Sequence, residues 1–306
     1  MLTRDRRPAF TLIELLVVIS IIAVLSAITV AAVFGVRRSM QTQNCEATIG
    51  KLDQKIGNRV KEIRDQIQSD IGVTGKARAE FEAAKSLTGG NDEGAKSLML
   101  YARLRQQLPM SFAEGNAPLT LGTHTYQPSP AFREFNTLTA NPATIEQSAV
   151  CLHAAINAMG MMDGLEQQVG TLDATSGPLA GQKVFMDGFN TPIGFVRIAY
   201  DGAGGELNAR PQAANPAQDP FDRDNKLSAL FQSNTPLWNS LLGPQLTNAG
   251  PYSYATPYRF NPALNNRNHA IVLISAGPNK VFAEPTLYDG DNILSYRLRR
   301  EGANGN

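Results

Sequence analysis

A single ionisable side chain, Glu14, lies near the start of an otherwise uncharged apolar run. The run extends from Phe10 to Val36, a stretch of 27 residues in which Glu14 is the one charge. A carboxylate in a membrane helix costs several kcal/mol unless it is paired, so such residues are functional candidates by default. The chemistry open to Glu14 is therefore charge pairing with a cation from a neighbouring chain, away from water.

The apolar run has the length of a membrane-spanning helix. As a helix it would be about 40 Å long, and the hydrocarbon core of a bilayer is roughly 30 Å thick. A secretory signal peptide has an apolar region of only about 7–15 residues, so this run is too long for one. Nothing else in the sequence approaches this length of apolar residues, so we expect a single-pass protein. Arginines flank the run on both sides, so charge alone gives little bias of orientation: Arg4, Arg6, Arg7, Arg37 and Arg38.

The residues at the start of the run resemble a known processing signal. Residues 7–19, Arg-Pro-Ala-Phe-Thr-Leu-Ile-Glu-Leu-Leu-Val-Val-Ile, are similar to the prepilin cleavage and methylation motif of type IV pilins and type II secretion pseudopilins. The resemblance implies that prepilin peptidase cuts between Ala9 and Phe10 and methylates the new amino group of Phe10. Glu14 then becomes the fifth residue of the mature chain, as the family motif requires. The family usually has Gly before the cut, where this sequence has Ala9.

The same resemblance implies a role for Glu14 and a location for the chain. In a helical filament, the Glu14 carboxylate would accept the positively charged amine of Phe10 from a neighbouring subunit. That pair would set the register, while the apolar faces of the helices supply most of the assembly energy. A Glu that snorkels at the membrane edge is the alternative. The leader would lie in the cytoplasm, the apolar helix in the inner membrane, and the domain in the periplasm or otherwise outside the cytoplasm.

Beyond the membrane run, the sequence predicts an amphipathic helix that continues to about residue 70. Apolar residues recur at spacings of three and four on one stripe: Ile49, Leu52, Ile56, Val60, Ile63 and Ile67. No proline interrupts residues 10–70, so the span and this helix can form one rod whose stripe packs on the C-terminal domain. Further helices are expected at three places: 75–87, 93–108 and 145–159.

From residue 184 the pattern changes to strands and turns. Residues 184–198 predict a strand, a tight turn and a strand, and residues 270–282 predict a strand followed by a Ser-Ala-Gly-Pro loop. Both stretches are similar to the C-terminal region of major pseudopilins. A final strand is expected at 293–298.

The likeness to major pseudopilins also implies a calcium site. In that family the loop after the strand binds Ca²⁺ through hard oxygen ligands. The candidate ligands here are Asp289 and Asp291, with Glu284 as a weaker candidate. Asn279 stands where the family has Asp, and a solvated turn is the alternative interpretation.

Together these elements predict an α+β fold. We expect a long N-terminal helix packed on a C-terminal globular domain that contains extra helices and a small antiparallel sheet. The expected divisions are 1–9 (leader), 10–36 (transmembrane and polymerisation helix), 37–70 (amphipathic continuation), 71–160 (helical insertion) and 161–306 (small-sheet pseudopilin-like domain). The helices of the insertion exceed what a small pseudopilin contains, and the sequence assigns them no role.

The remaining chemistry-bearing residues give no catalytic pattern. Cys45 and Cys151 are far apart, which rules out a cysteine-based zinc site but permits either one long-range disulfide or two separate buried thiols. The three histidines have no ligand-like spacing, and no HExxH, P-loop or GxGxxG motif occurs. The formal net charge of +1 gives no bulk electrostatic reason to expect nucleic-acid binding. We therefore do not expect an enzyme.

The function that these patterns favour is structural. We expect a pseudopilin-like subunit of a type II secretion filament, with prepilin peptidase, other copies of itself, minor pseudopilins, the inner-membrane assembly platform and membrane lipid as partners. A type IV pilus subunit for adhesion, motility or DNA uptake is the alternative within the class. A membrane-tethered extracytoplasmic domain that binds a ligand or catalyses a reaction is the alternative from another class.

Overall fold

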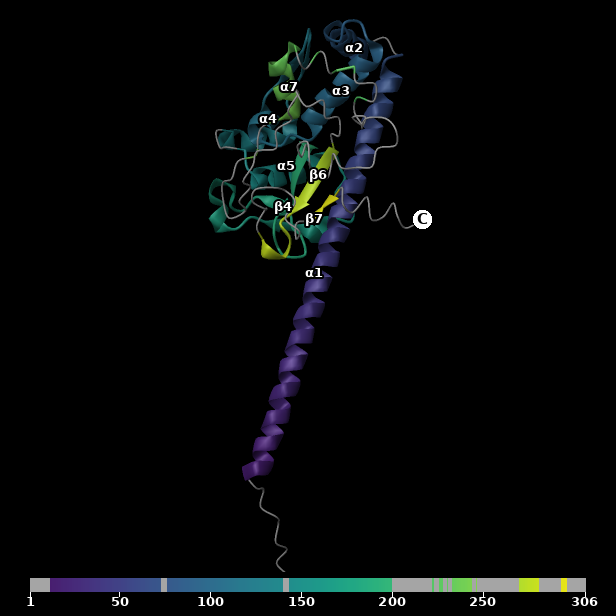
Figure 1. The fold of residues 1–306 in the computed structure, drawn as a ribbon. Helices are drawn as coiled ribbons and strands as arrows, with labels where there is room; N and C mark the ends of the chain where they lie inside the picture. Colours follow the sequence, from purple (N-terminus) through teal and green to yellow (C-terminus); the bar gives the residue numbers. More distant parts are fainter. Residues whose placement is uncertain are drawn as a thin grey trace, which may run out of the picture.

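The computed structural model describes residues 12–72, 76–139, 143–199, 233–243, 270–280 and 293–295, with a few further positions between 222 and 246. Its architecture is α+β: one very long helix carries a domain of shorter helices and small antiparallel sheets at one end (Figure 1).

Helix α1 (Leu12–Asp70) runs without interruption through 59 residues, which corresponds to about 88 Å. One half protrudes as a bare stem and the other half lies along the domain (Figure 1). The predicted stripe is the part of α1 that packs on the domain: Ile49, Leu52, Ile56, Ile63 and Ile67 are at most 2 % exposed. Val60 is partly buried against the same core. The expected amphipathic continuation is thus confirmed.

Short helices follow α1, and the first two of them contact it. They are α2 (Lys76–Leu87), α3 (Asp92–Gln107), α4 (Phe112–Asn116), the 3-10 helix η1 (Pro130–Leu138) and α5 (Ile145–Ala158). Asn91 and Thr144 cap α3 and α5, because their side chains accept the N–H of Gly94 and Gln147. The three helices expected from the sequence are confirmed. A hairpin of β1 (Leu119–Leu121) and β2 (His124–Tyr126), as well as η1, lies in a stretch for which the sequence predicted no elements.

Two small antiparallel sheets complete the domain. The first pairs β3 (Val169–Thr171) with β4 (Lys183–Phe185), and the second has the order β5 (Gly194–Ala199), β6 (Ala270–Ser275), β7 (Ile293–Leu294). Short helical segments lie between the strands: η2 (Glu166–Gln168), η3 (Ala174–Leu179), α7 (Thr235–Leu242) and η5 (Gly277–Asn279). The largely buried helix α5 contacts β4 and β5, and α1 contacts β6, so the main core lies between these helices and the sheet.

The turn expected within 184–198 is present, but its two strands are not partners along their length. β4 pairs with β3, whereas β5 pairs with β6, with Gly194 opposite Ile274. A single bridge between Met186 and Pro192 closes the turn. Beyond this bridge the two strands separate, and each pairs with a different neighbour.

Asp187 is a buried carboxylate that joins this turn to the end of β6. Its Oδ1 accepts the N–H of Phe189 and of Thr191, each at 2.8 Å. Its Oδ2 accepts the hydroxyls of Thr191 and Ser275, each at 2.5 Å. Ser275 in turn accepts the N–H of Gly277 at 3.0 Å. Residues almost ninety positions apart in the sequence are thereby held together beside α1.

The turn that Asp187 fixes contacts α1 at Gln41, close to the point where the helix leaves the domain. A Cβ atom added at Gly188 would lie 2.0 Å from the backbone oxygen of Gln41. Only a glycine therefore permits the two backbones to approach so closely. One turn further along the helix, Cys45 is fully buried and begins the stripe that packs on the domain.

This contact predicts that Gly188→Ala will weaken the attachment of α1. The methyl group would meet a helix backbone that cannot move alone, so we expect the free energy of unfolding to fall by about 1–3 kcal/mol. Denaturation of the detergent-solubilised chain measures the change. Gly50→Ala is the matched control: it lies on the exposed side of α1 with nothing within 4 Å. It should raise helix stability by about 0.5–1 kcal/mol. Equal stability of Gly188→Ala and the wild type would contradict the docking argument.

Candidate assembly site

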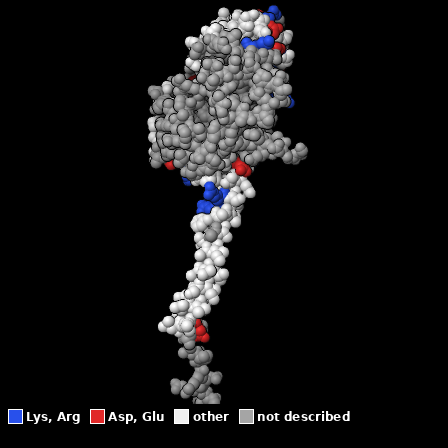
Figure 2. Space-filling view, viewed as in Figure 1, with Lys and Arg blue, Asp and Glu red and all other residues white. Residues whose placement is uncertain are grey.

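The face of the α1 stem seen in Figure 2 is almost free of charged side chains. Its large side chains are exposed, from Val18 at 44 % to Leu12 at 82 %. They are Leu12, Ile13, Leu15, Leu16, Val17, Val18, Ile19, Ile21, Ile22, Val24, Leu25, Ile28, Val30, Val33, Phe34, Val36 and Met40. In the part of the chain that the structure describes, α1 is the one helix long and apolar enough to cross a membrane. A helix that is apolar all round is suited to lipid or to contact with other apolar helices.

Two hydroxyl groups within the stem, those of Ser20 and Thr29, are satisfied by the stem itself. Ser20 Oγ donates to the carbonyl oxygen of Leu16, and Thr29 Oγ1 donates to that of Leu25, both at 2.8 Å. Such bonds to the preceding turn remove the cost of placing a hydroxyl in an apolar medium. These residues therefore need no partner from another chain.

Glu14 is an ionisable group at the base of the stem. It lies in the first turn of α1, where the partial positive charge of the helix N-terminus favours a carboxylate. From Glu14 to Arg37 the helix rises about 35 Å, close to the roughly 30 Å thickness of a bilayer core. The charges thus mark the two ends of an apolar segment of membrane dimensions. Ala9 and Phe10, the other two predicted residues of this site, lie outside the described residues.

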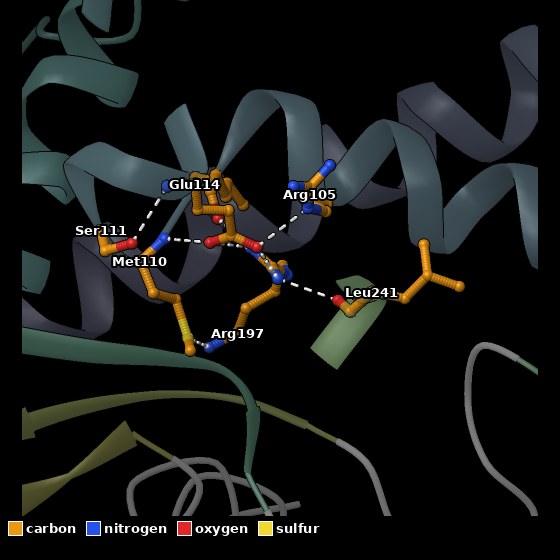
Figure 3. Close-up of polar contacts among 7 residues, drawn as sticks. Arg105, Met110, Ser111, Glu114, Arg197 and Leu241 are labelled. Atoms are coloured by element: carbon orange, nitrogen blue, oxygen red, sulfur yellow. Dashed lines mark hydrogen bonds and ion pairs between the residues drawn. The ribbon is translucent and has the colours of Figure 1, made fainter. Parts of the chain in front are cut away.

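A second group of charges, centred on Glu114, is buried inside the domain (Figure 3). Arg197 in β5 is fully buried, and its two Nη atoms donate to the Glu114 carboxylate at 2.5 and 3.0 Å. The same atoms donate to the carbonyl oxygens of Leu108 at 2.8 Å and Leu241 at 2.9 Å. One guanidinium therefore joins β5, α4, α7 and the end of α3.

Other donors surround the same carboxylate. The N–H of Met110 donates to Glu114 Oε2 at 2.7 Å, and Arg105 Nε lies 3.3 Å from Oε1. Burial lowers the pKa of Arg105, and the repulsion from Arg197 acts in the same direction, whereas Glu114 opposes them. Donors of this chain already occupy both oxygens of this buried carboxylate, so neither is open to accept a proton from a substrate. The role of this cluster is therefore structural: its hydrogen bonds and ion pairs hold four elements of the domain together.

A third cluster, Glu80 with Arg103 and Tyr126, fastens the helical end of the domain to α1. Arg103 donates to both oxygens of Glu80, at 3.0 and 2.7 Å, and the Tyr126 hydroxyl donates to the same carboxylate. Burial and the neighbouring Glu80 charge raise the pKa of Tyr126. Arg103 also lies 3.5 Å from Asp70, the last residue of α1. This cluster, too, connects elements and presents no reactive group to solvent.

Sequence patterns pointed to none of these buried clusters. A weak signal existed for Asp187, because an Asp-Gly pair between two predicted strands is typical of a turn, and the Asp side chain in such a turn accepts the backbone N–H two residues on. For Arg197 the signal was its place two residues after Phe195 in a strand, which puts both on one face. The partners Ser275 and Glu114 are distant in the sequence, so no local pattern could supply them.

The two cysteines occupy separate places in the core. Both are buried and free, so the structure contains no Cys45–Cys151 disulfide. Cys45 on α1 faces Ser275 and the backbone of Gly188, whereas Cys151 lies on α5. Burial raises the pKa of Cys45 to about 12 and raises that of Cys151 well above its ordinary value. Thiols in this state are poor nucleophiles at neutral pH.

The calcium prediction falls outside the described residues. Asp289, Asp291 and Glu284 all lie there. Among the residues that are described, no group of three or more His, Cys, Asp or Glu side chains is arranged to hold a metal ion.

Comparison with known proteins bears on the N-terminus. A family model described as "Prokaryotic N-terminal methylation motif" matches residues 4–30. The chain carries a prepilin-type processing motif. The match includes Ala9, Phe10 and Glu14, so the start of the stem is similar to the N-terminal helices of pilins and pseudopilins, which are typically structural subunits that prepilin peptidase processes and that polymerise. No curated protein and no solved structure matches the chain.

The burial of the cysteines predicts their reactivity. In the native chain at pH 8, iodoacetamide should leave both Cys45 and Cys151 unmodified, because the raised pKa values keep the thiols protonated and water does not reach them. Unfolding in denaturant without reductant should expose two reactive thiols, counted by mass spectrometry. An Ala47→Cys variant, which adds a thiol at an exposed position of α1, should react once in the native state. Two thiols that react only after reduction would show a disulfide instead.

Proposed function

We propose that the chain is a structural subunit of a type II secretion pseudopilus-like filament. Prepilin peptidase removes residues 1–9 and methylates Phe10, and the mature subunit assembles through the stem of α1 to support protein secretion. The observation that carries the proposal is the bare apolar stem, which bears Glu14 near one end and the domain at the other, and whose first part lies in the matched methylation motif.

The energetics of the stem support assembly. Keeping apolar surface out of water lowers the free energy by about 25 cal/mol for each Å². Packing against neighbouring helices keeps the stem in apolar surroundings when it leaves the lipid. Packing alone would let helices slide along one another. A buried pair of the Glu14 carboxylate and the Phe10 amine of a neighbour would prevent this sliding, because a misaligned subunit would leave both charges unpaired.

Secretion is favoured over a surface pilus by two stretches of the domain. Residues 184–198 and 270–282 are the stretches that are similar to major pseudopilins. The hydrogen bond between Ser275 and Asp187 joins these two stretches beside α1. We also propose, from the same likeness, that Asp289 and Asp291 bind Ca²⁺. The minor pseudopilins and the inner-membrane assembly platform would be the partners. Neighbouring genes for a secretion ATPase and a secretin would support secretion, whereas a retraction ATPase would favour a type IV pilus.

Processing is tested at the N-terminus of the native protein. Mass spectrometry should find a chain that begins at Phe10 with one additional methyl group on its amine. The small side chain of Ala9 should permit the cut, and an Ala9→Gly variant should be processed at least as fast. A native chain that still begins at Met1 would overturn the processing step.

Assembly is tested at Glu14. Glu14→Ala should leave membrane insertion and cleavage unchanged and should abolish incorporation into filaments, because the neighbour's amine would lose its partner. The measurement is the amount of subunit in sheared or pulled-down filaments. Ser20→Ala, a change in the same stem at a hydroxyl bonded to its own helix, should assemble as the wild type does. Incorporation of Glu14→Ala at the wild-type level would refute the pairing.

A further inference from the structure

Two arginines form a basic collar where the stem meets the domain. Arg37 and Arg38 follow the apolar stem directly, and both are exposed. Neither forms an ion pair with any carboxylate in the described part of the chain. Figure 2 shows basic side chains gathered at the neck of the molecule, below the domain. Consecutive residues on a helix point about 100° apart, so the collar covers two neighbouring sides of α1.

We propose that Arg37 and Arg38 bind the phosphate groups of membrane phospholipids and so fix the depth of the stem in the bilayer before assembly. This inference rests on the membrane location of the stem in the proposed function. It names a ligand, the phosphodiester of a lipid headgroup, for residues to which the methylation motif assigns nothing, since the match ends at residue 30.

The position of the collar along α1 favours this ligand. About 35 Å of helix separates Arg37 from Glu14. When Glu14 lies at one edge of a hydrocarbon core of roughly 30 Å, the collar lies in the headgroup layer at the other edge. Long arginine side chains reach along the helix toward that layer. The guanidinium fork matches two phosphate oxygens at once, which a Lys ammonium does not.

The domain limits how far the collar can move. Its first backbone contact with α1, between Gly188 and Gln41, lies about 5 Å beyond Arg38 along the helix. Arg38 is seven residues from Cys45 and Cys45 is seven from Leu52, so Arg38 lies on the same side of α1 as the stripe that holds the domain. The collar thus lies between the base of the domain and the apolar stem. The domain prevents α1 from moving deeper into the bilayer. Movement of α1 out of the bilayer would expose the apolar stem to water.

Removal of the leader would make this anchor one-sided. Before cleavage, arginines flank the stem at both ends, at residues 4–7 and at 37–38. Dragging the first group through the bilayer core would cost several kcal/mol for each charge. The mature chain keeps arginines only at the end that carries the domain. Phosphate contacts at that end can be released into water when a subunit leaves the membrane on that side.

Solid-state NMR tests the contact. The full chain, labelled with ¹³C at arginine Cζ, is reconstituted in phosphatidylcholine vesicles, and dephasing of the Cζ signal by lipid ³¹P is measured. Arg37→Gln/Arg38→Gln should lose part of the dephasing found in the wild type, while any contribution from Arg4, Arg6 and Arg7 remains in both samples. Lys51→Gln/Lys61→Gln removes the same charge from exposed positions farther along α1 and should lose none.

The outcomes separate the sources of phosphate and the two proposals. Each single variant, Arg37→Gln or Arg38→Gln, should lose about half of what the double variant loses, which keeps the test valid if the double variant inserts poorly. Equal dephasing in the wild type and the variants would overturn the collar and favour carboxylates of a neighbouring subunit. The same dephasing in phosphorus-free detergent with inorganic phosphate would overturn lipid as the source. None of these results depends on filament assembly, which the Glu14 variants test separately.

Discussion

The structure depends on one continuous helix that must be stable in two environments. Except at its two ends, the backbone groups of α1 are satisfied inside the helix, so the same backbone is suited to lipid along the stem and to a protein core along the domain. What changes between the halves is the pattern of side chains. It is apolar on all sides below Arg37 and apolar on one stripe above it. A break in the helix would leave the stem without a rigid connection to the domain.

The domain is held on α1 by a few polar and close backbone contacts as well as by the apolar stripe. Asp187 fixes a turn against Gln41, and Arg103 reaches Asp70 at the far end of the helix. Removing one partner of such a pair is costly, because a buried charge or donor is left unsatisfied. Apolar packing tolerates sliding, whereas these contacts are satisfied at one alignment. They therefore specify where the domain lies along the helix, which in turn places it at a set height above the stem.

Much of the fold could be predicted where the signal is local. The span, the stripe from Ile49 to Ile67, and the helices α2, α3 and α5 follow from periodicity and caps within short windows. The pairing of β4 with β3, and of β5 with β6, could not be predicted. The turn at Asp187 has the local appearance of a hairpin, and only the hydroxyl of Ser275, nearly ninety residues away, reveals the second role of that carboxylate.

The sequence by itself determined the processing motif, the spacing of Phe10 and Glu14, and the length of the apolar stem, because each is a property of consecutive residues. Tertiary structure decided that Cys45 and Cys151 remain separate thiols, that Glu114 neutralises Arg197, and that Gly188 meets the backbone of α1. These outcomes depend on distances between residues far apart in the chain. Such distances are set by the packing of the whole core, and they cannot be deduced from any short stretch of sequence.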